Sequence, residues 1–255
     1  MIFKRLAIQF ISIRLLRGCG EIMGAFQVAN PSDRRGIKLG ISGAGKRVGG
    51  NLATAIFNIA SNQKYPFYFD PVSVYTQTGN GARKLKSRFF PQATVFEGHE
   101  GYEQMLTPSW RGGQWLEAVI IASPNQAHEY QTRTAIEAGG IDSIRGIYVD
   151  KPIALIDTGV ELVSDTIRDN RFIGAIVAGL PFRLDPTIQG LRKMLANGAL
   201  EIGEVLSVSH TCKLNLVPKG EEGGNWKLGL GMGGPISMFG IHAQDMQIEL
   251  MGEFG

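Results

Sequence analysis

Cysteine and metal-ligand clusters are scarce in this chain. Its 255 residues include two cysteines, Cys19 and Cys212, which are too few and too far apart for a disulfide framework or a zinc site. The four histidines show no paired spacing with cysteine or acidic residues, so no metal centre is predicted. A reducing cytoplasm fits this composition, because structural disulfides are rare there.

Long hydrophobic runs are also missing. The apolar run Leu6–Ile13 follows two basic residues, but Arg14 and Arg17 limit it to eight residues, too short to span a bilayer. No small-residue cleavage site follows it cleanly, which argues against a signal peptide. Residues 1–36 are therefore interpreted as a disordered or non-native extension, with Met23 the natural start, and no membrane partner is expected.

A basic surface is not indicated for the folded part. The formal net charge is +3, yet residues 1–35 hold six Lys or Arg against two acids and contribute +4 of it. The remainder carries −1, which removes the usual electrostatic argument for nucleic-acid binding. A hydrophobic content of 44% at this length permits a sizeable core in one or two domains.

What the chain does contain is a strand, a glycine turn and a helix in the order of a dinucleotide-binding motif. The strand Ile37–Ser42 leads into Gly43, which makes the tight turn. Gly45 lets backbone N–H groups approach a pyrophosphate at the positive end of the following helix. Val48 stands where a third glycine is expected, with Gly49 one place later, so the motif is weakened but not abolished.

The same segment has an alternative interpretation. Residues Gly40–Lys46 also fit the phosphate loop of nucleoside triphosphatases up to its lysine. That loop needs a Ser or Thr hydroxyl after the lysine to hold magnesium, and Arg47 supplies no acceptor there. The dinucleotide interpretation is therefore favoured.

The second predicted strand, Val72–Tyr75, is not followed by the acid that binds a ribose 2′-hydroxyl in NAD sites. Thr76 and Gln77 occupy that place, and hydroxyls and cations suit a 2′-phosphate, so NADP is favoured over NAD. It stays open whether the cations of segment 83–86 are only the solvated face of the next helix. The cations that could converge on a 2′-phosphate are Lys46, Arg47, Arg83 and Lys84.

Two further apolar strands end in polar residues. Leu116–Ala122 runs into Ser123-Pro124-Asn125, and Ile147–Val149 runs into Asp150-Lys151-Pro152. Ligands of open parallel sheets bind outside the carboxyl ends of the strands, so Lys151 is predicted to face a ligand crevice. Taken alone, the segment is also consistent with a solvated turn closed by proline.

These segments together resemble the glucose-fructose oxidoreductase, inositol dehydrogenase and MocA family. The residues that carry the resemblance are Gly43-Ala44-Gly45, Ser123-Pro124-Asn125 with His128, and Asp150-Lys151-Pro152. A lone histidine at a helix start, as His128 is predicted to be, is otherwise usually a cap or a surface residue. Downstream, Leu180–Pro186 is similar to the start of the family's second domain, and Asn225–Lys227 with Gly233–Asp245 resembles its substrate-side motif. The match spans roughly residues 37–252 in the expected order.

The resemblance implies an α/β fold: a Rossmann-type doubly wound parallel sheet over residues 37–180, followed by an α+β substrate domain over residues 181–255. It also implies an NAD(P)-dependent dehydrogenase or reductase that transfers a hydride between a nicotinamide cofactor, NADP favoured, and a sugar, polyol or related hydroxy compound. Lys151 would be the catalytic lysine, because hydride leaves a carbinol carbon only as its hydroxyl proton is removed. His242 would be the second proton-handling group.

The remaining site residues follow from the same motifs. The substrate-binding residues are expected to be Arg183, Trp226, Lys227 and Asp245. The cofactor-binding residues are expected to be Gly43, Ala44, Gly45, Lys46, Arg47, Val48, Thr76, Gln77, Ser123, Pro124, Asn125, His128, Asp150 and Lys151.

The sequence departs from the family pattern in two places. Family members often carry an acid four residues before the histidine, and this chain has Met238, which can neither accept a proton nor orient a hydroxyl. In the family, several antiparallel strands follow the helix of His242; here Val205–Thr211 reads as the first strand of that sheet, without its partners. The second domain is therefore expected to be incomplete, and a homo-oligomer is expected only for a full-length form.

Two alternatives to an active enzyme stay open. The first is a non-catalytic dinucleotide- or sugar-binding regulatory protein on the same scaffold, with Met238 marking lost catalysis. The second is an inactive truncated product whose nucleotide-binding half still folds, since that sheet is complete up to Ile173–Val177.

Overall fold

The computed structural model describes residues 34–251 apart from 46, 63, 140–142 and 197–239. The chain divides into two compact units, Met1–Ala178 and Gly179–Gly255, and each is considered by itself. No helix within the described ranges combines the length and apolar character needed to cross a bilayer.

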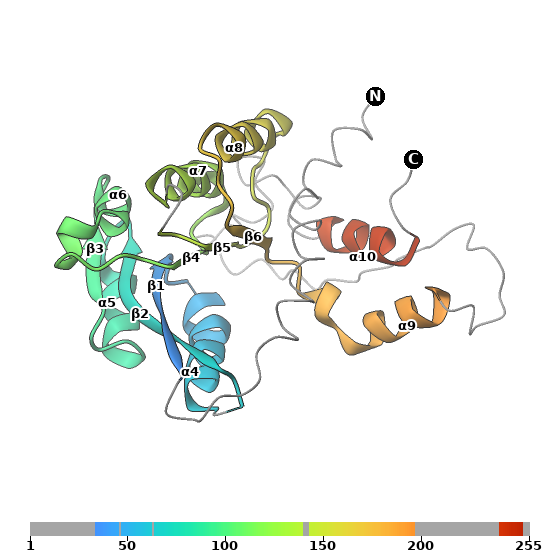
Figure 1. The fold of residues 1–255 in the computed structure, drawn as a ribbon, viewed down its shortest axis with the longest axis horizontal. Coiled ribbons are helices and arrows are strands. Elements are labelled where there is room, and N and C mark those ends of the chain that lie inside the picture. Colours follow the sequence, from blue (N-terminus) through green and yellow to red (C-terminus); the bar gives the residue numbers. More distant parts are fainter. Residues whose placement is uncertain (1–33, 46, 63, 140–142, 197–239, 252–255) are drawn as a thin grey trace, which may run out of the picture. The chain divides into compact units, whose positions relative to one another are not determined.

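A six-stranded parallel sheet forms the centre of the first unit (Figure 1). Its strand order is β3-β2-β1-β4-β5-β6, and every neighbouring pair is parallel. The order reverses between β1 and β4, which defines the doubly wound topology and confirms the predicted Rossmann-type α/β fold. The strands are β1 (Arg35–Ser42), β2 (Phe67–Thr76), β3 (Thr94–Glu97), β4 (Ala118–Ile121), β5 (Gly146–Val149) and β6 (Ala175–Ala178).

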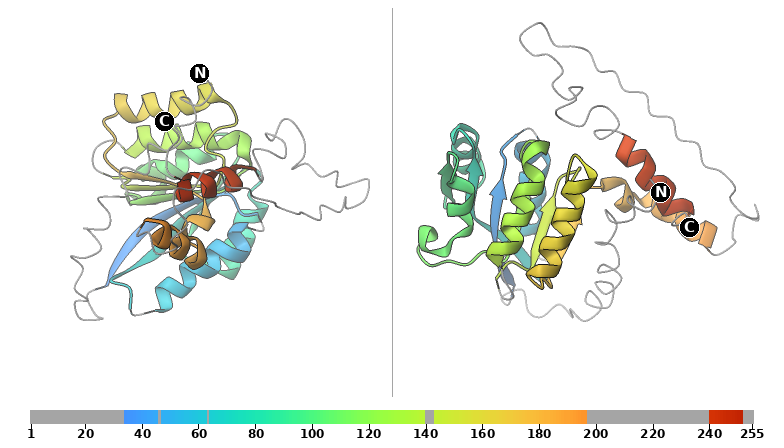
Figure 2. Two further views of the ribbon diagram at one scale, coloured as in Figure 1. Left: turned by 90° about the vertical axis from the view of Figure 1, so that its right-hand side faces the viewer. Right: turned by 90° about the horizontal axis from the view of Figure 1, so that it is seen from above.

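Helices cover both faces of the sheet, so both faces of the central strands are apolar, as in other parallel sheets. Along β4, Val119 and Ile121 pack into one core cluster while Ile120 packs into the other. Figure 2 shows α7 and α8 on one side of the sheet and α4 on the other. The helical segments of this unit are η3 (Arg47–Leu52), α4 (Ala53–Ser61), α5 (Asn80–Arg88), α6 (Gly101–Leu106), η4 (Pro108–Arg111), η5 (Asn125–Ala127), α7 (His128–Gly139) and α8 (Asp157–Asp169).

Strand β2 is longer than the predicted segment Val72–Tyr75. It begins at Phe67 and includes Pro71, near which the register with β1 shifts. Strand β3 pairs with β2 only from Ser73 onward, so Pro71 faces no strand on that side. Proline is tolerated in a strand at such an edge position, because no ladder hydrogen bond needs its missing N–H.

The start of β1 is fixed by a residue that precedes it. The guanidinium of Arg34 donates hydrogen bonds to the carbonyl oxygens of four residues around the turn between α4 and β2. Residues 34–36 are therefore part of the folded unit, although the sequence pattern assigned them to the N-terminal extension. The four acceptors are the carbonyls of Ile59, Ala60, Tyr65 and Phe67.

Three helical segments are described in the second unit: η6 (Pro181–Leu184), α9 (Pro186–Ala196) and α10 (Ile241–Met251). Helix α10 carries His242 and contacts both η6 and α9. The predicted strand Val205–Thr211 lies outside the described residues.

Candidate functional site

The glycine turn lies at the carboxyl end of β1, beside the point where the strand order reverses. Gly43 has a φ of +102°, and a Cβ built there would lie 2.3 Å from the carbonyl oxygen of Ala122. Its N–H donates to the carbonyl of Tyr75 over 2.9 Å. Only glycine fits this position, because any side chain meets backbone of the loop after β4.

Gly45 fulfils a different requirement. No heavy atom lies within 4 Å of a Cβ built at this position, and the residue is exposed. The missing side chain therefore leaves open space, as a backbone approach to a phosphate requires. Val48, in contrast, is fully buried at 0% exposure, and its side chain packs in a core cluster.

A cavity of about 450 Å³ opens between the glycine-rich segment and α5. It combines an unobstructed backbone with two cationic side chains, Lys84 and Arg88, which suits an anionic ligand. A Cβ built at Gly50, which lines this space, also meets no atom within 4 Å. The lining residues are Ala44, Gly45, Gly49, Gly50, Thr54, Gly81, Lys84, Leu85, Arg88 and Phe89.

The end of β2 has no acid of its own, as the sequence indicated. Thr76 Oγ1 accepts a hydrogen bond from the N–H of Ala82 (3.4 Å), and the exposed Gln77 accepts one from the hydroxyl of Tyr75 (2.9 Å). An acid nevertheless stands nearby, because Glu97 at the end of β3 is in register with Thr76.

The predicted cations have different surroundings. Arg83 is engaged by Glu97 (2.8 Å) and by the side chain of Asn80 (3.1 Å), whereas Lys84 lines the cavity. Arg47 makes an ion pair with Asp150, and Lys46 lies outside the described residues.

His128 is a buried residue and not a surface one, contrary to the default interpretation of a lone histidine at a helix start. It is 1% exposed, with Nδ1 2.7 Å from the carbonyl oxygen of Pro152 and Nε2 2.8 Å from that of Ser123. His128 thus bridges the segments that follow β4 and β5.

Gln131, one turn further along α7, is a buried polar residue of the candidate site that the sequence analysis missed. Its Oε1 accepts hydrogen bonds from Ser42 at the end of β1 (2.9 Å) and from Ser123 after β4 (2.7 Å). One sequence signal could have revealed it: Gln131 is a polar residue three positions after His128, on the helix face that packs against the sheet and should be apolar. Gln131 is 4% exposed.

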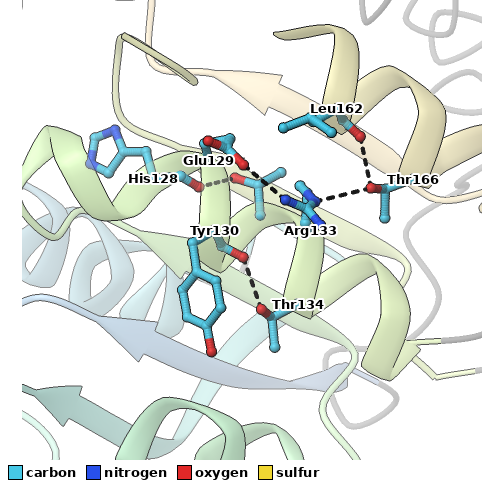
Figure 3. Close-up of polar contacts among 8 residues, drawn as sticks. His128, Glu129, Tyr130, Arg133, Thr134, Leu162 and Thr166 are labelled. Carbon is cyan, nitrogen blue, oxygen red and sulfur yellow. Dashed lines mark hydrogen bonds and ion pairs between the residues drawn. The ribbon is translucent and has the colours of Figure 1, made fainter. Parts of the chain in front are cut away.

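Helix α7 is itself held against α8, as Figure 3 shows. Arg133 donates to Glu129 on its own helix (3.0 Å) and to the hydroxyl of Thr166 on α8 (3.3 Å). Thr166 in turn donates to the carbonyl of Leu162 (2.7 Å). These contacts fix the helix whose first turn carries His128.

The lysine segment follows β5 and is largely buried. Lys151 is 8% exposed, and its N–H donates to Oδ1 of Asp150 over 2.9 Å. The interpretation of this segment as a solvated turn therefore does not hold. Asn125, on η5 after β4, is also buried at 7% exposure, whereas Pro124 before it is exposed.

In the second unit, Arg183 of η6 and Asp245 of α10 form an ion pair. Arg183 Nε donates to Asp245 Oδ1 over 2.6 Å, and the aspartate side chain is 2% exposed. The ring of His242 lies edge-on to Phe182, with centroids 5.2 Å apart. The three other positions that the sequence singled out here, Trp226, Lys227 and Met238, lie outside the described residues.

Among the described residues, no group of three or more His, Cys, Asp or Glu side chains is arranged to hold a metal ion.

No family model and no curated protein matches the chain. Solved structures do match: an oxidoreductase from Thermotoga maritima (TM-score 0.64, 19% identity, 86% of this chain and 60% of that one) is one example. The WlbA dehydrogenase from Thermus thermophilus, solved with NAD and UDP-GlcNAcA, is another. Its TM-score is 0.63 at 21% identity, and the match covers 85% of this chain and 63% of that one. A levoglucosan dehydrogenase in complex with NADH and levoglucosan is a third. Its TM-score is 0.65 at 19% identity, and the match covers 86% of this chain and 55% of that one.

These neighbours are oxidoreductases of the type to which the sequence motifs point. The chain therefore has the fold of these dehydrogenases, as the resemblance led us to expect. It spans less than two thirds of the length of each of the three.

Proposed function

We propose that the protein is an NAD(P)-dependent oxidoreductase of the glucose-fructose oxidoreductase, inositol dehydrogenase and MocA type. The observation that carries the proposal is the buried Lys151, which follows β5 in a sheet whose glycine turn lies at the reversal of strand order. Structural neighbours that share this fold were solved with NAD or NADH. Their crystallised ligands are sugar-like, which supports a sugar, polyol or related hydroxy compound as substrate.

The residues at the carboxyl edge of the sheet fit a dinucleotide. Gly45 and Gly50 leave open space beside a cavity that also carries Lys84 and Arg88, as a pyrophosphate and its adenosine require. A bound nicotinamide would supply the hydride acceptor or donor. The described residues that would hold the cofactor are the backbone of residues 43–45 and 47–48, Thr76, Gln77, the segment Ser123–Asn125, and the main chain of Asp150.

Lys151 is the proposed proton acceptor. In oxidation its amine would take the proton from the substrate hydroxyl oxygen as hydride leaves the adjoining carbon, and in reduction the ammonium would return it. His128 bears on this group indirectly, because it holds the carbonyl of Pro152, the next residue. His128 therefore belongs to the support of the site and not to proton transfer.

The residues proposed to act on the substrate side belong to the second unit. His242 is the proposed second proton-handling group, and Trp226 and Lys227 are proposed to contact the substrate. The Arg183–Asp245 ion pair joins η6 to α10, the helix that carries His242, so its role would be to fix that helix as well as to face a hydroxyl group. The protein is proposed to be cytoplasmic and to form a homo-oligomer.

Turnover decides between an enzyme and a regulatory binding protein. Purified protein would be incubated with NADP or NAD and a panel of polyols and sugars, and in reverse with NADPH or NADH and keto sugars, while reduced cofactor is followed by absorbance. Turnover of any member supports the oxidoreductase. Tight binding of NADPH without turnover of any compound supports the regulatory protein, which Met238 also favours. Absence of both contradicts the proposal.

We predict that NADP is preferred to NAD through Lys84 and Arg88. Replacing both by glutamine is expected to lower the NADP-over-NAD ratio of kcat/KM roughly tenfold or more, the factor that follows from losing a charged hydrogen bond. Lys86→Gln is the matched control, because Lys86 is on the same helix but does not line the cavity. A preference for NAD in the unaltered protein would contradict the prediction and would point to Glu97 as the ribose ligand.

A further inference from the structure

Arg47, the first residue of η3, connects the glycine turn to the lysine segment. Its Nε lies 3.0 Å from Oδ2 of Asp150, an ion pair whose N–H is not aligned for a hydrogen bond. Its Nη2 donates to the hydroxyl of Tyr148 on β5 over 3.1 Å. The guanidinium therefore reaches from the pyrophosphate end of the site to the strand that delivers Lys151.

This ion pair is more enclosed than those on the molecule's surface. The Arg47 and Asp150 side chains are 35% and 18% exposed, against 73% and 52% for Arg168 and Asp165 on α8. Burial disfavours the charged guanidinium, but the hydrogen bond to Tyr148 and the charge of Asp150 outweigh it and raise the pKa of Arg47. The guanidinium accordingly stays charged and engaged.

The carboxylate of Asp150 connects two partners. Its Oδ2 faces Arg47, and its Oδ1 accepts the main-chain N–H of Lys151 over 2.9 Å. On the far side of the lysine, the carbonyl of Pro152 is held by His128 over 2.7 Å. The main chain of the lysine segment is thus anchored both before and after Lys151.

We infer that Arg47 is a positioning residue for Lys151, acting through Asp150, and that its guanidinium is not a phosphate ligand. Cofactor phosphates would then be bound by the backbone of the glycine turn and not by this side chain. The inference rests on the proposed function, because it assigns a role around the proposed catalytic lysine.

The test is a double-mutant cycle of Arg47→Met and Asp150→Asn, with kcat and the cofactor KM measured for each protein. We expect each single variant to lose roughly 10- to 100-fold in kcat, the order of loss that follows a small misplacement of a reacting group. The cofactor KM should change far less, and the double variant should be no worse than the poorer single one, because both act on one interaction. Arg47→Lys should recover part of kcat, and Arg168→Met, which removes a surface ion pair, should match the unaltered protein.

A different pattern would overturn the inference. If Arg47→Met raises the cofactor KM at unchanged kcat, and the effect of Asp150→Asn is independent of it in the double variant, Arg47 is a phosphate ligand. If the unaltered protein has no turnover, the proposed function fails separately, and amide hydrogen exchange then decides the role of Arg47. Faster exchange of the Lys151 N–H in Arg47→Met supports the inference, and unchanged exchange overturns it. Thermal melting of each variant confirms that it is folded.

Discussion

Replacing Lys151 by methionine should lower turnover by roughly 10²–10⁴-fold, the usual contribution of a positioned acid or base. Methionine has a similar length and is apolar, so it fits a position that is 8% exposed without leaving a buried charge. The cofactor should still bind, because the glycine turn and the cavity beside α5 are unchanged. Steady-state rates on the best polyol or sugar, together with a cofactor titration, measure the two effects separately.

The matched control for this prediction is Lys64→Met, which changes an exposed lysine before β2. Its kcat and its cofactor affinity should equal those of the unaltered protein. The role assigned to Lys151 would be refuted by a Lys151→Met protein that keeps its kcat. Loss of cofactor binding alone, with turnover restored at saturating cofactor, would instead make Lys151 a binding residue.

Replacing Gly43 by alanine should destabilise the first unit severely. The position has a φ of +102°, and the added Cβ would lie 2.3 Å from one backbone atom of the loop after β4 and 2.5 Å from another. Strain of this backbone type and overpacking each cost about 1–3 kcal/mol. A urea denaturation curve should show the combined loss as a lower midpoint, and the cofactor should bind poorly because the turn itself is displaced.

Gly45→Ala is the control, since a Cβ at that position meets nothing within 4 Å. Its unfolding midpoint should stay close to that of the unaltered protein, while its cofactor affinity falls because the methyl group enters the space meant for phosphate. Equal destabilisation by the two substitutions would contradict the distinct requirements assigned to the two glycines.

Much of the fold could be predicted because its signals are local. Apolar runs such as Leu116–Ala122 mark strands that are buried on both faces, and Gly43 marks the turn that ends β1. The length of β2 could not be predicted in this way, because Pro71 argues against a strand unless one knows that β3 pairs only from Ser73. The extent of this pairing is a feature of the tertiary structure and has no local signal in the sequence.

The places of the candidate residues at strand ends could be predicted from the sequence, but their contacts could not. Lys151 was placed at a strand end by its sequence context alone. No sequence pattern indicated that Arg47 pairs with Asp150, or that Gln131 joins two strand ends, because these partners are distant along the chain. His128 was judged by the usual behaviour of helix-start histidines, which does not apply where two loops present carbonyls to the ring.

The shared acceptor on Gln131 has a consequence for how the site adapts to ligands of different size. One oxygen atom ties Ser42 to Ser123, so the carboxyl ends of β1 and β4 cannot spread apart without losing two hydrogen bonds together with rungs of the ladder between them. The opposite wall, where Lys84 and Arg88 lie exposed on α5, has no shared acceptor of this kind among the described contacts; α5 meets the strand ends through two separate hydrogen bonds, Ala82 to Thr76 and Arg83 to Glu97. When a bulkier ligand binds, α5 should therefore shift, while the carboxyl ends of β1 and β4 stay in place.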